Sequence, residues 1–268
     1  MTRIDKVFRR LKEKGEKALI PFITAGDPDY ETSRRLAIEI AARGADLLEL
    51  GIPFSDPLAD GPTIQASSSR ALKNGVHFAS VLALAGDLRR ETDIPLILMG
   101  YYNPILQYGL EKAARDAAQQ GIDGFIIPDL PLEEAASWRA ATGAAGVSVI
   151  FLAAPTTGPE RLKTLGRLTQ GFLYYVSVTG ITGARMELTR ELIPELLRVR
   201  ALVNCPIAVG FGISTPEQVK KLAPYVDGVV VGSAIVQQVA QFSGAKTIKH
   251  IGDFVASLKT PLRGGKDA

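Results

Sequence analysis

One carboxylate lies where the sequence predicts a buried strand. Residues 46–50 read DLLEL, a leucine-rich run with Glu49 near its end. Because side chains alternate along a strand, Leu48 and Leu50 share one face, and Leu47 and Glu49 share the other. If Leu48 and Leu50 pack outward against helices, Glu49 points into the interior of the fold. Poor solvation raises the pKa of a carboxyl group, so Glu49 could act first as an acid and then as a base.

The alternative interpretation of Glu49 is a buried charge neutralised by a structural cation. The sequence contains eight strand-like runs, and none of them includes a lysine or an arginine. No neighbouring strand therefore offers an inward-facing cation, which favours the catalytic interpretation. The same absence argues against a Schiff-base aldolase, because that chemistry needs a lysine at a strand end.

Two further acids, Asp56 and Asp60, follow Glu49 in the loop GIPFSDPLADGP at 51–62. Each lies beside a proline or a glycine, and a turn-forming role explains either one alone. Their position favours function, because this loop follows the strand that presents Glu49 and could bring a carboxylate to the same substrate. Two carboxylates in unlike environments can divide the acid and base roles of a reaction.

The elements that must position these groups alternate between strands and helices. The strand-like runs are 18–24, 46–50, 95–99, 123–128, 147–153, 172–177, 206–210 and 227–232. Amphipathic segments lie at 31–43, 63–73, 78–91, 110–120, 132–141, 159–168, 188–200 and 215–223, and 233–241 and 247–258 follow the last run. This alternation predicts an α/β fold with a parallel sheet covered on both faces. Eight such units in 268 residues match a (β/α)8 TIM barrel.

Additional helices are expected near both ends of the chain. Ile4, Val7, Phe8 and Leu11 form one face of an N-terminal helix, and the two segments after the eighth run are extra helices near the last strand. No linker divides the chain, so we expect a single domain over residues 1–268, with a flexible tail from about 262. A doubly wound open sheet is the alternative, although the first run lacks a following GxGxxG loop.

Three later strand ends are rich in glycine: SVTGITGAR at 177–185, VGFGIST at 209–215 and VVGSAI at 230–235. Turn formation explains each of them singly. Together they predict a phosphate site, since barrels of this kind often bind phosphate at the loops after the last two strands and at a short extra helix. Backbone amides from Gly232 and Ser233 onward can hold a dianion without lysine or arginine. We therefore expect a phosphorylated substrate.

Composition narrows the class of protein. The net charge is +3, from 31 Lys and Arg against 28 Asp and Glu, and the basic residues are scattered, which is a poor pattern for nucleic-acid binding. The N-terminal segment has no apolar run typical of a signal peptide or a membrane span. Cys205 is the one cysteine, and His77 and His250 are the two histidines, so no zinc-type cluster is expected. We expect a cytoplasmic protein that uses acid-base chemistry without an imine or a metal.

The motif LELGIPFSDPLADGPTIQ at 48–65 resembles the α subunit of tryptophan synthase. Supporting motifs are PFITAGDP from 21, YYNPI from 101, PDLP from 128, TGITGAR from 179, GFGIS from 210 and DGVVVGSAIV from 227, and the resemblance spans about residues 4–258. It implies a lyase that cleaves indole-3-glycerol phosphate to indole and glyceraldehyde 3-phosphate by a retro-aldol step. Protonation of the indole ring at C3 would create an electron sink within the substrate, so neither lysine nor metal is needed.

The resemblance also implies roles for single residues. Glu49 would give a proton to C3 and accept one from the glycerol hydroxyl, and Asp60 would stabilise the positive charge at the indole nitrogen. Tyr174 matches the active-site tyrosine of the family, although barrel filling explains it equally well. Phe22 and Met99 match the indole pocket, with Met99 replacing an expected leucine; taken alone, both are more often core residues. The remaining substrate-binding matches are Thr182 and Gly183 in a mobile loop whose threonine closes over Asp60, together with Phe211. Four of the family's matches form the phosphate site: Gly183, Gly212, Gly232 and Ser233.

The family works as an allosteric αββα complex with a PLP-dependent β subunit, which receives indole through an internal tunnel. The resemblance places Asp56, Pro57, Asn103 and Asp129 near that interface or in its signalling loops. It implies no cofactor in this chain, because the PLP would be the partner's. Two alternatives remain: a free-standing lyase that releases indole without a β subunit, and a non-catalytic barrel that only activates a β subunit.

Overall fold

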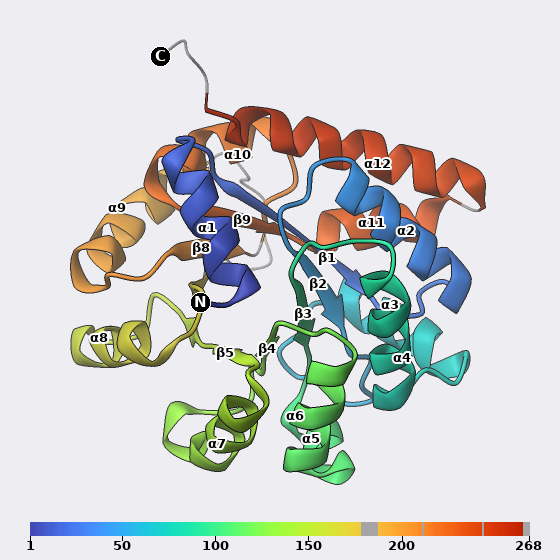
Figure 1. The fold of residues 1–268 in the computed structure, drawn as a ribbon. Coiled ribbons are helices and arrows are strands. Elements are labelled where there is room, and N and C mark those ends of the chain that lie inside the picture. The colour runs from blue at the N-terminus through green and yellow to red at the C-terminus, as the bar shows by residue number, and fades with distance from the viewer. Residues whose placement is uncertain (178–186, 211, 243, 265–268) are drawn as a thin grey trace.

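A computed structural model describes residues 1–177, 187–210, 212–242 and 244–264 of the chain. Its core is a parallel sheet in the order β5-β4-β3-β2-β1-β9-β8-β7-β6. The strands are β1 (Ala18–Thr24), β2 (Leu48–Gly51), β3 (Leu96–Met99), β4 (Gly124–Ile126), β5 (Ser148–Ile150), β6 (Leu152–Ala153), β7 (Leu173–Val176), β8 (Ile207–Gly210) and β9 (Gly228–Val231). The first and last strands of this order are consecutive in the chain, so the sheet curls into a nearly closed barrel. The prediction of a TIM barrel is confirmed (Figure 1).

The predicted run 147–153 forms two strands instead of one, because β5 and β6 are separated by Phe151. At this point side chains replace the strand ladder: the Phe151 amide donates to Thr169 Oγ1 at 3.0 Å, and the Val149 amide donates to Gln170 Oε1 at 2.9 Å. β5 therefore pairs with β4, and β6 pairs with β7. The prediction of a single strand here was wrong because apolar periodicity carries no information about such side-chain substitutes.

Helices surround the strands, as Figure 1 shows. They are α1 (Arg3–Glu13), α2 (Tyr30–Ala42), α3 (Pro62–Lys73), α4 (Phe78–Arg89), α5 (Tyr102–Tyr108), α6 (Leu110–Gln119), α7 (Ala136–Ala145), α8 (Pro159–Leu168), α9 (Glu187–Leu202), α10 (Pro216–Leu222), α11 (Ser233–Gln241) and α12 (Ala245–Lys259). Short 3₁₀ turns lie at Leu132–Glu134, Ala223–Tyr225 and Thr260–Leu262. The sequence predicted all of the α-helices except α5, which is short and contains Pro104 in its first turn.

The barrel interior forms its own apolar cluster. Leu47, Ile97, Ile150 and Tyr174 belong to it, together with the buried face of α1, which fills the end where the strands begin. Thr2 caps α1, since its side chain accepts from the Asp5 amide and the Asp5 carboxylate accepts from the Thr2 amide. In the described part of the chain, α1 closes this end of the barrel. A site can therefore lie at the opposite end, where the strands finish.

A second cluster lies between the strands and the surrounding helices, and it contains Leu48 and Leu50. Leu47 lies in the inner cluster instead. This distribution confirms the alternation predicted for residues 46–50, with Leu48 and Leu50 facing outward. The same alternation sends Glu49 inward.

A buried ion pair anchors the start of β2. Nζ of Lys259 donates to Asp46 Oδ2 at 2.7 Å and to the Lys17 carbonyl at 3.0 Å, and the Asp46 carboxylate accepts from the Leu19 amide at 2.9 Å. These contacts join the end of α12 to the beginnings of β1 and β2. The contacts of Lys259 and Asp46 fix the beginning of β2, and Glu49 lies toward the other end of this strand.

Candidate active site

Glu49 is fully buried near the end of β2, in register with Phe22 of β1 and Ile97 of β3. Neither carboxylate oxygen has a hydrogen-bond partner among the described residues, and no cation there neutralises the group. Burial alone raises the pKa of Glu49 well above its ordinary value, as the sequence predicted. An ionised carboxylate without a partner is very costly in such surroundings, so burial favours the protonated form of Glu49.

Tyr174 of β7 also points into the barrel and belongs to its inner cluster. Burial, and secondly the charge of Glu49, raise the pKa of the Tyr174 phenol well above its ordinary value. Gly210 of β8 leaves room for this ring, because a Cβ atom at 210 would lie 2.2 Å from the Tyr174 hydroxyl oxygen. Tyr174 therefore both fills the barrel and lies within the electrostatic field of Glu49.

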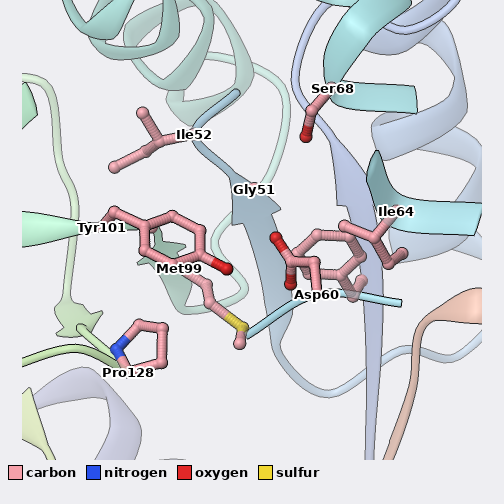
Figure 2. Close-up of a pocket in the computed structure, with 10 residues that line it drawn as sticks. Gly51, Ile52, Asp60, Ile64, Ser68, Met99, Tyr101 and Pro128 are labelled. Carbon is pink, nitrogen blue, oxygen red and sulfur yellow. The ribbon is translucent and has the colours of Figure 1, made fainter. Parts of the chain in front are cut away.

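A pocket opens beside Glu49 at the carboxyl-terminal end of the strands. Phe22, which is in register with Glu49, and Gly51, two residues further along β2, both line it. Figure 2 shows Asp60 reaching into this pocket from the loop after β2, opposite Met99 of β3. The predicted site residues Phe22, Asp60 and Met99 are thus brought together. Among the described residues, the pocket is lined by Phe22, Gly51, Ile52, Asp60, Ile64, Ser68, Met99, Gly100, Tyr101 and Pro128.

Asp60 differs from Glu49 in its surroundings. Burial raises the pKa of the Asp60 carboxyl group, while a hydrogen bond from the Tyr101 hydroxyl opposes that rise. The Asp60 carboxyl group therefore lines the pocket with a hydrogen-bond donor beside it, whereas the Glu49 carboxyl group, next to Phe22 in the sheet, has no hydrogen-bond partner among the described residues. Two carboxyl groups in unlike environments can take different roles in acid-base chemistry.

Tyr101 is one of the lining residues that sequence reasoning missed, and it is the one that contacts the loop tip through its side chain. Its hydroxyl contacts Asp60 and also accepts a hydrogen bond of 2.9 Å from the Ala59 amide. The motif YYNPI from 101 contributes to the resemblance, but nothing in the sequence indicates that its first tyrosine reaches the loop after β2. Only the pairing of β2 with β3 brings the two loops together.

The candidate phosphate site lies where β8 and β9 end. These strands are neighbours, Gly212 follows β8 with φ +79°, and Gly232 precedes α11, whose first residue is Ser233. A Cβ atom at Gly232 would lie 3.5 Å from the Phe22 side chain, so the start of α11 is next to the pocket. The first amides of a helix have no intrahelical acceptor and point out of its N-terminus, where they favour an anion.

Other predicted residues lie on the surface or outside the described chain. Asp56, Asn103 and Asp129 are exposed, and Pro57 is partly exposed. Two apolar side chains are also exposed in these regions, Leu58 at 94% in the loop after β2 and Leu106 at 47% in α5. Thr182, Gly183 and Phe211 lie outside the described residues.

Two features are absent from the described part of the chain. No three His, Cys, Asp or Glu side chains gather there in a way that could hold a metal ion. None of the described helices is long and apolar enough to span a membrane.

Comparisons with known proteins agree with this geometry. The family model described as "Tryptophan synthase alpha chain" matches residues 8–260. The tryptophan synthase alpha chain of Citrifermentans bemidjiense is 50% identical over 259 residues, which cover 97% of each chain. The structure of tryptophan synthase subunit alpha from Legionella pneumophila aligns with a TM-score of 0.91 and 40% identity over 98% of both chains. A structure of Mycobacterium tuberculosis tryptophan synthase aligns with a TM-score of 0.89 and 35% identity over 98% of this chain and 99% of that one. This chain belongs to the tryptophan synthase alpha chain family.

Proposed function

We propose that this chain is a lyase that cleaves indole-3-glycerol phosphate to indole and glyceraldehyde 3-phosphate in tryptophan biosynthesis. The observation that carries the proposal is Glu49, a fully buried carboxyl group whose oxygens have no hydrogen-bond partner among the described residues. It borders a pocket that also contains Asp60. A protonated acid beside an apolar pocket suits a reaction that begins by protonating an aromatic carbon.

Glu49 starts the reaction by donating its proton to C3 of the indole ring, which leaves a positive charge at the ring nitrogen. The resulting carboxylate takes the proton of the glycerol hydroxyl next to the ring. The carbon–carbon bond then breaks, its electrons restore the aromatic ring, and the hydroxyl carbon becomes the aldehyde. The proton given to C3 stays on the indole, and Glu49 ends the turnover protonated by the hydroxyl proton, so it acts as acid and base in one turnover.

Asp60 stabilises the positive charge at the indole nitrogen while the bond breaks. Its carboxylate must be ionised for this role, and the hydrogen bond from Tyr101 favours that form. Phe22 and Met99 would hold the ring between apolar surfaces. Tyr174 would shape the opposite wall beside Glu49.

The phosphate of the substrate would bind at Gly212, Gly232 and Ser233. Support comes from the positive φ of Gly212, which favours glycine, and from the position of the α11 N-terminus beside Phe22. Thr182, Gly183 and Phe211 remain predictions from the resemblance, with Thr182 closing over Asp60.

We also propose an αββα complex with a PLP-containing β subunit, in the cytoplasm. Asp56, Pro57, Asn103 and Asp129 would lie at or near this interface. The exposed Leu58 and Leu106 support a contact here, because large apolar side chains on the surface are suited to burial against a partner. The PLP would bind to the β subunit.

The test is an assay of the purified chain with indole-3-glycerol phosphate, in which indole and glyceraldehyde 3-phosphate are both measured. The proposal predicts that they form in equal amounts and that adding a β subunit markedly accelerates the reaction. Equal rates with and without β subunit would support the free-standing lyase instead. Failure to form glyceraldehyde 3-phosphate under either condition would show that the barrel is a non-catalytic activator.

A further inference from the structure

We propose that Tyr101 is a positioning residue that fixes the loop after β2 and aims the Asp60 carboxylate into the pocket. The inference rests on the proposed function for the role of Asp60, but the contact between Tyr101 and the loop can be tested without it. Tyr101 itself is not assigned a part in proton transfer. It acts through the residue that it holds.

The hydroxyl of Tyr101 makes two contacts with consecutive residues of the loop. Its oxygen accepts a hydrogen bond of 2.9 Å from the Ala59 amide, and the same hydroxyl lies near enough to the Asp60 carboxyl group to lower its pKa as a hydrogen-bond donor. Figure 2 shows the Tyr101 hydroxyl and the Asp60 carboxylate turned toward each other across the pocket. One hydroxyl group can satisfy both contacts, because it has one donor and two acceptor positions.

The Ile52 amide ties the beginning of the loop to the Met99 carbonyl of β3, but the tip, residues 55–61, has little else to hold it. Among the described residues, the other hydrogen bonds of the tip stay within it or run to the start of α3: Ser55 and the Leu58 amide donate to Asp56, the Asp60 amide donates to Pro57, and the carbonyls of Asp60 and Gly61 accept from Gln65. Leu58 is 94% exposed, so it gives the loop no apolar anchor. The two contacts with Tyr101 therefore join the tip of the loop to the strand next to β2.

Tyr101 is itself held firmly. It is buried, and its ring lies 5.4 Å from the ring of Phe54, centroid to centroid. Tyr102, the next residue, begins α5, and its amide donates a 2.9 Å hydrogen bond to Asp129 in the loop after β4. A buried tyrosine beside the start of α5 is a suitable anchor for the exposed tip of the loop.

The experiment compares Tyr101→Phe with Tyr102→Phe. The first substitution keeps the ring and removes both contacts; the second makes the same chemical change one residue along, at a hydroxyl with no hydrogen bond among the described residues. Turnover of indole-3-glycerol phosphate gives kcat and KM, and hydrogen exchange of the peptide covering residues 53–61 reports on the loop. Thermal unfolding confirms that both variants are folded.

For Tyr101→Phe we expect kcat to fall on the order of 10- to 100-fold, the loss typical of one hydrogen bond to a charged group, while KM changes by less than about three-fold. The loop peptide should exchange faster, because the Ala59 amide loses its acceptor. Tyr102→Phe should match the unsubstituted protein in both measurements. In an Asp60→Ala background, Tyr101→Phe should lower kcat little further, because its effect passes through Asp60.

The inference is overturned if Tyr101→Phe keeps normal kcat, if the loop exchanges at the normal rate, or if the losses from Tyr101→Phe and Asp60→Ala simply multiply. These outcomes differ from a failure of the proposed function. If the unsubstituted protein does not cleave indole-3-glycerol phosphate, the lyase assignment fails and the kinetic part of the inference falls with it. The exchange measurement would still decide whether Tyr101 holds the loop.

Discussion

Tyr174 occupies the space that a side chain at Gly210 would need. A Cβ atom at Gly210 would lie 2.2 Å from the hydroxyl oxygen and 2.7 Å from the Cζ atom of Tyr174. The tyrosine is buried and lies within the electrostatic field of Glu49. Tyr174 can therefore occupy this position only because residue 210 is a glycine. Substitutions at the two positions should have non-additive effects on the free energy of unfolding.

Gly210→Ala should lower the free energy of unfolding by about 1–3 kcal/mol, the usual cost of overpacking a core, and should reduce activity. In a Tyr174→Ala background the same substitution should cost almost nothing, because the conflicting atoms are gone. Urea unfolding of the four proteins measures the coupling. Gly143→Ala is the control, since its added Cβ has no neighbour within 4 Å. Additive effects at 174 and 210 would show that the steric conflict is relieved in another way.

Glu49→Gln should change how stability depends on pH. The ordinary pKa of 4.5 applies in the unfolded chain, and burial raises the pKa in the folded one. Between the two values the folded protein keeps a proton that the unfolded chain has lost. The stability contributed by protonated Glu49 is therefore complete below the ordinary pKa. It falls as the pH rises to the folded pKa, by about 1.4 kcal/mol for each pH unit between the two values.

The glutamine variant lacks this titration. Its stability relative to the unsubstituted protein should therefore increase from about pH 4 toward neutral pH, in line with the raised pKa of Glu49 in the folded protein. Urea unfolding at a series of pH values measures the difference. Two parallel stability curves would mean that the pKa of Glu49 is not raised in the folded protein.

Ser233→Asp should separate substrate binding from stability. A carboxylate at the start of α11 interacts favourably with the helix dipole, so the variant should be as stable as the unsubstituted protein or slightly more stable. The same charge repels a phosphate at that helix end, and like charges in contact cost several kcal/mol, so KM should rise at least about ten-fold. Ser233→Ala controls for loss of the hydroxyl. An unchanged KM for Ser233→Asp would exclude phosphate binding at this helix.

Lys259→Met should affect stability without affecting catalysis. It leaves Asp46 buried without its 2.7 Å partner, and breaking a buried pair in this way typically costs about 3–5 kcal/mol. The pair lies where β2 begins, whereas the site lies where the strands end. Urea unfolding and steady-state kinetics on the same sample test this. A large loss of kcat in the folded variant would contradict the separation of the two ends of the barrel.

The sequence predicts much of this arrangement because its signals are local. Glu49 breaks an apolar run, and strict alternation in residues 46–50 then gives its direction. Alternating strands and helices predict the barrel in the same way. These features depend on residues close together in the chain, so periodicity is sufficient to find them.

Other features depend on contacts that local patterns do not contain. The role of Tyr101 arises from the pairing of β2 with β3, which brings its hydroxyl to Ala59, 42 positions away in the chain. The break at Phe151 arises because Thr169 supplies a hydrogen bond in place of a neighbouring strand. Helix α5 has only seven residues and a proline in its first turn, so it gives no helical periodicity to recognise.

Glu49 is the acid and base of the proposed reaction, and the most direct test of this role is the turnover of indole-3-glycerol phosphate by Glu49→Gln. The amide keeps the shape of the side chain but cannot exchange a proton in the same way. We predict that release of glyceraldehyde 3-phosphate falls at least about 100-fold while the variant stays folded and still binds the substrate. Near-normal turnover by Glu49→Gln would contradict this role.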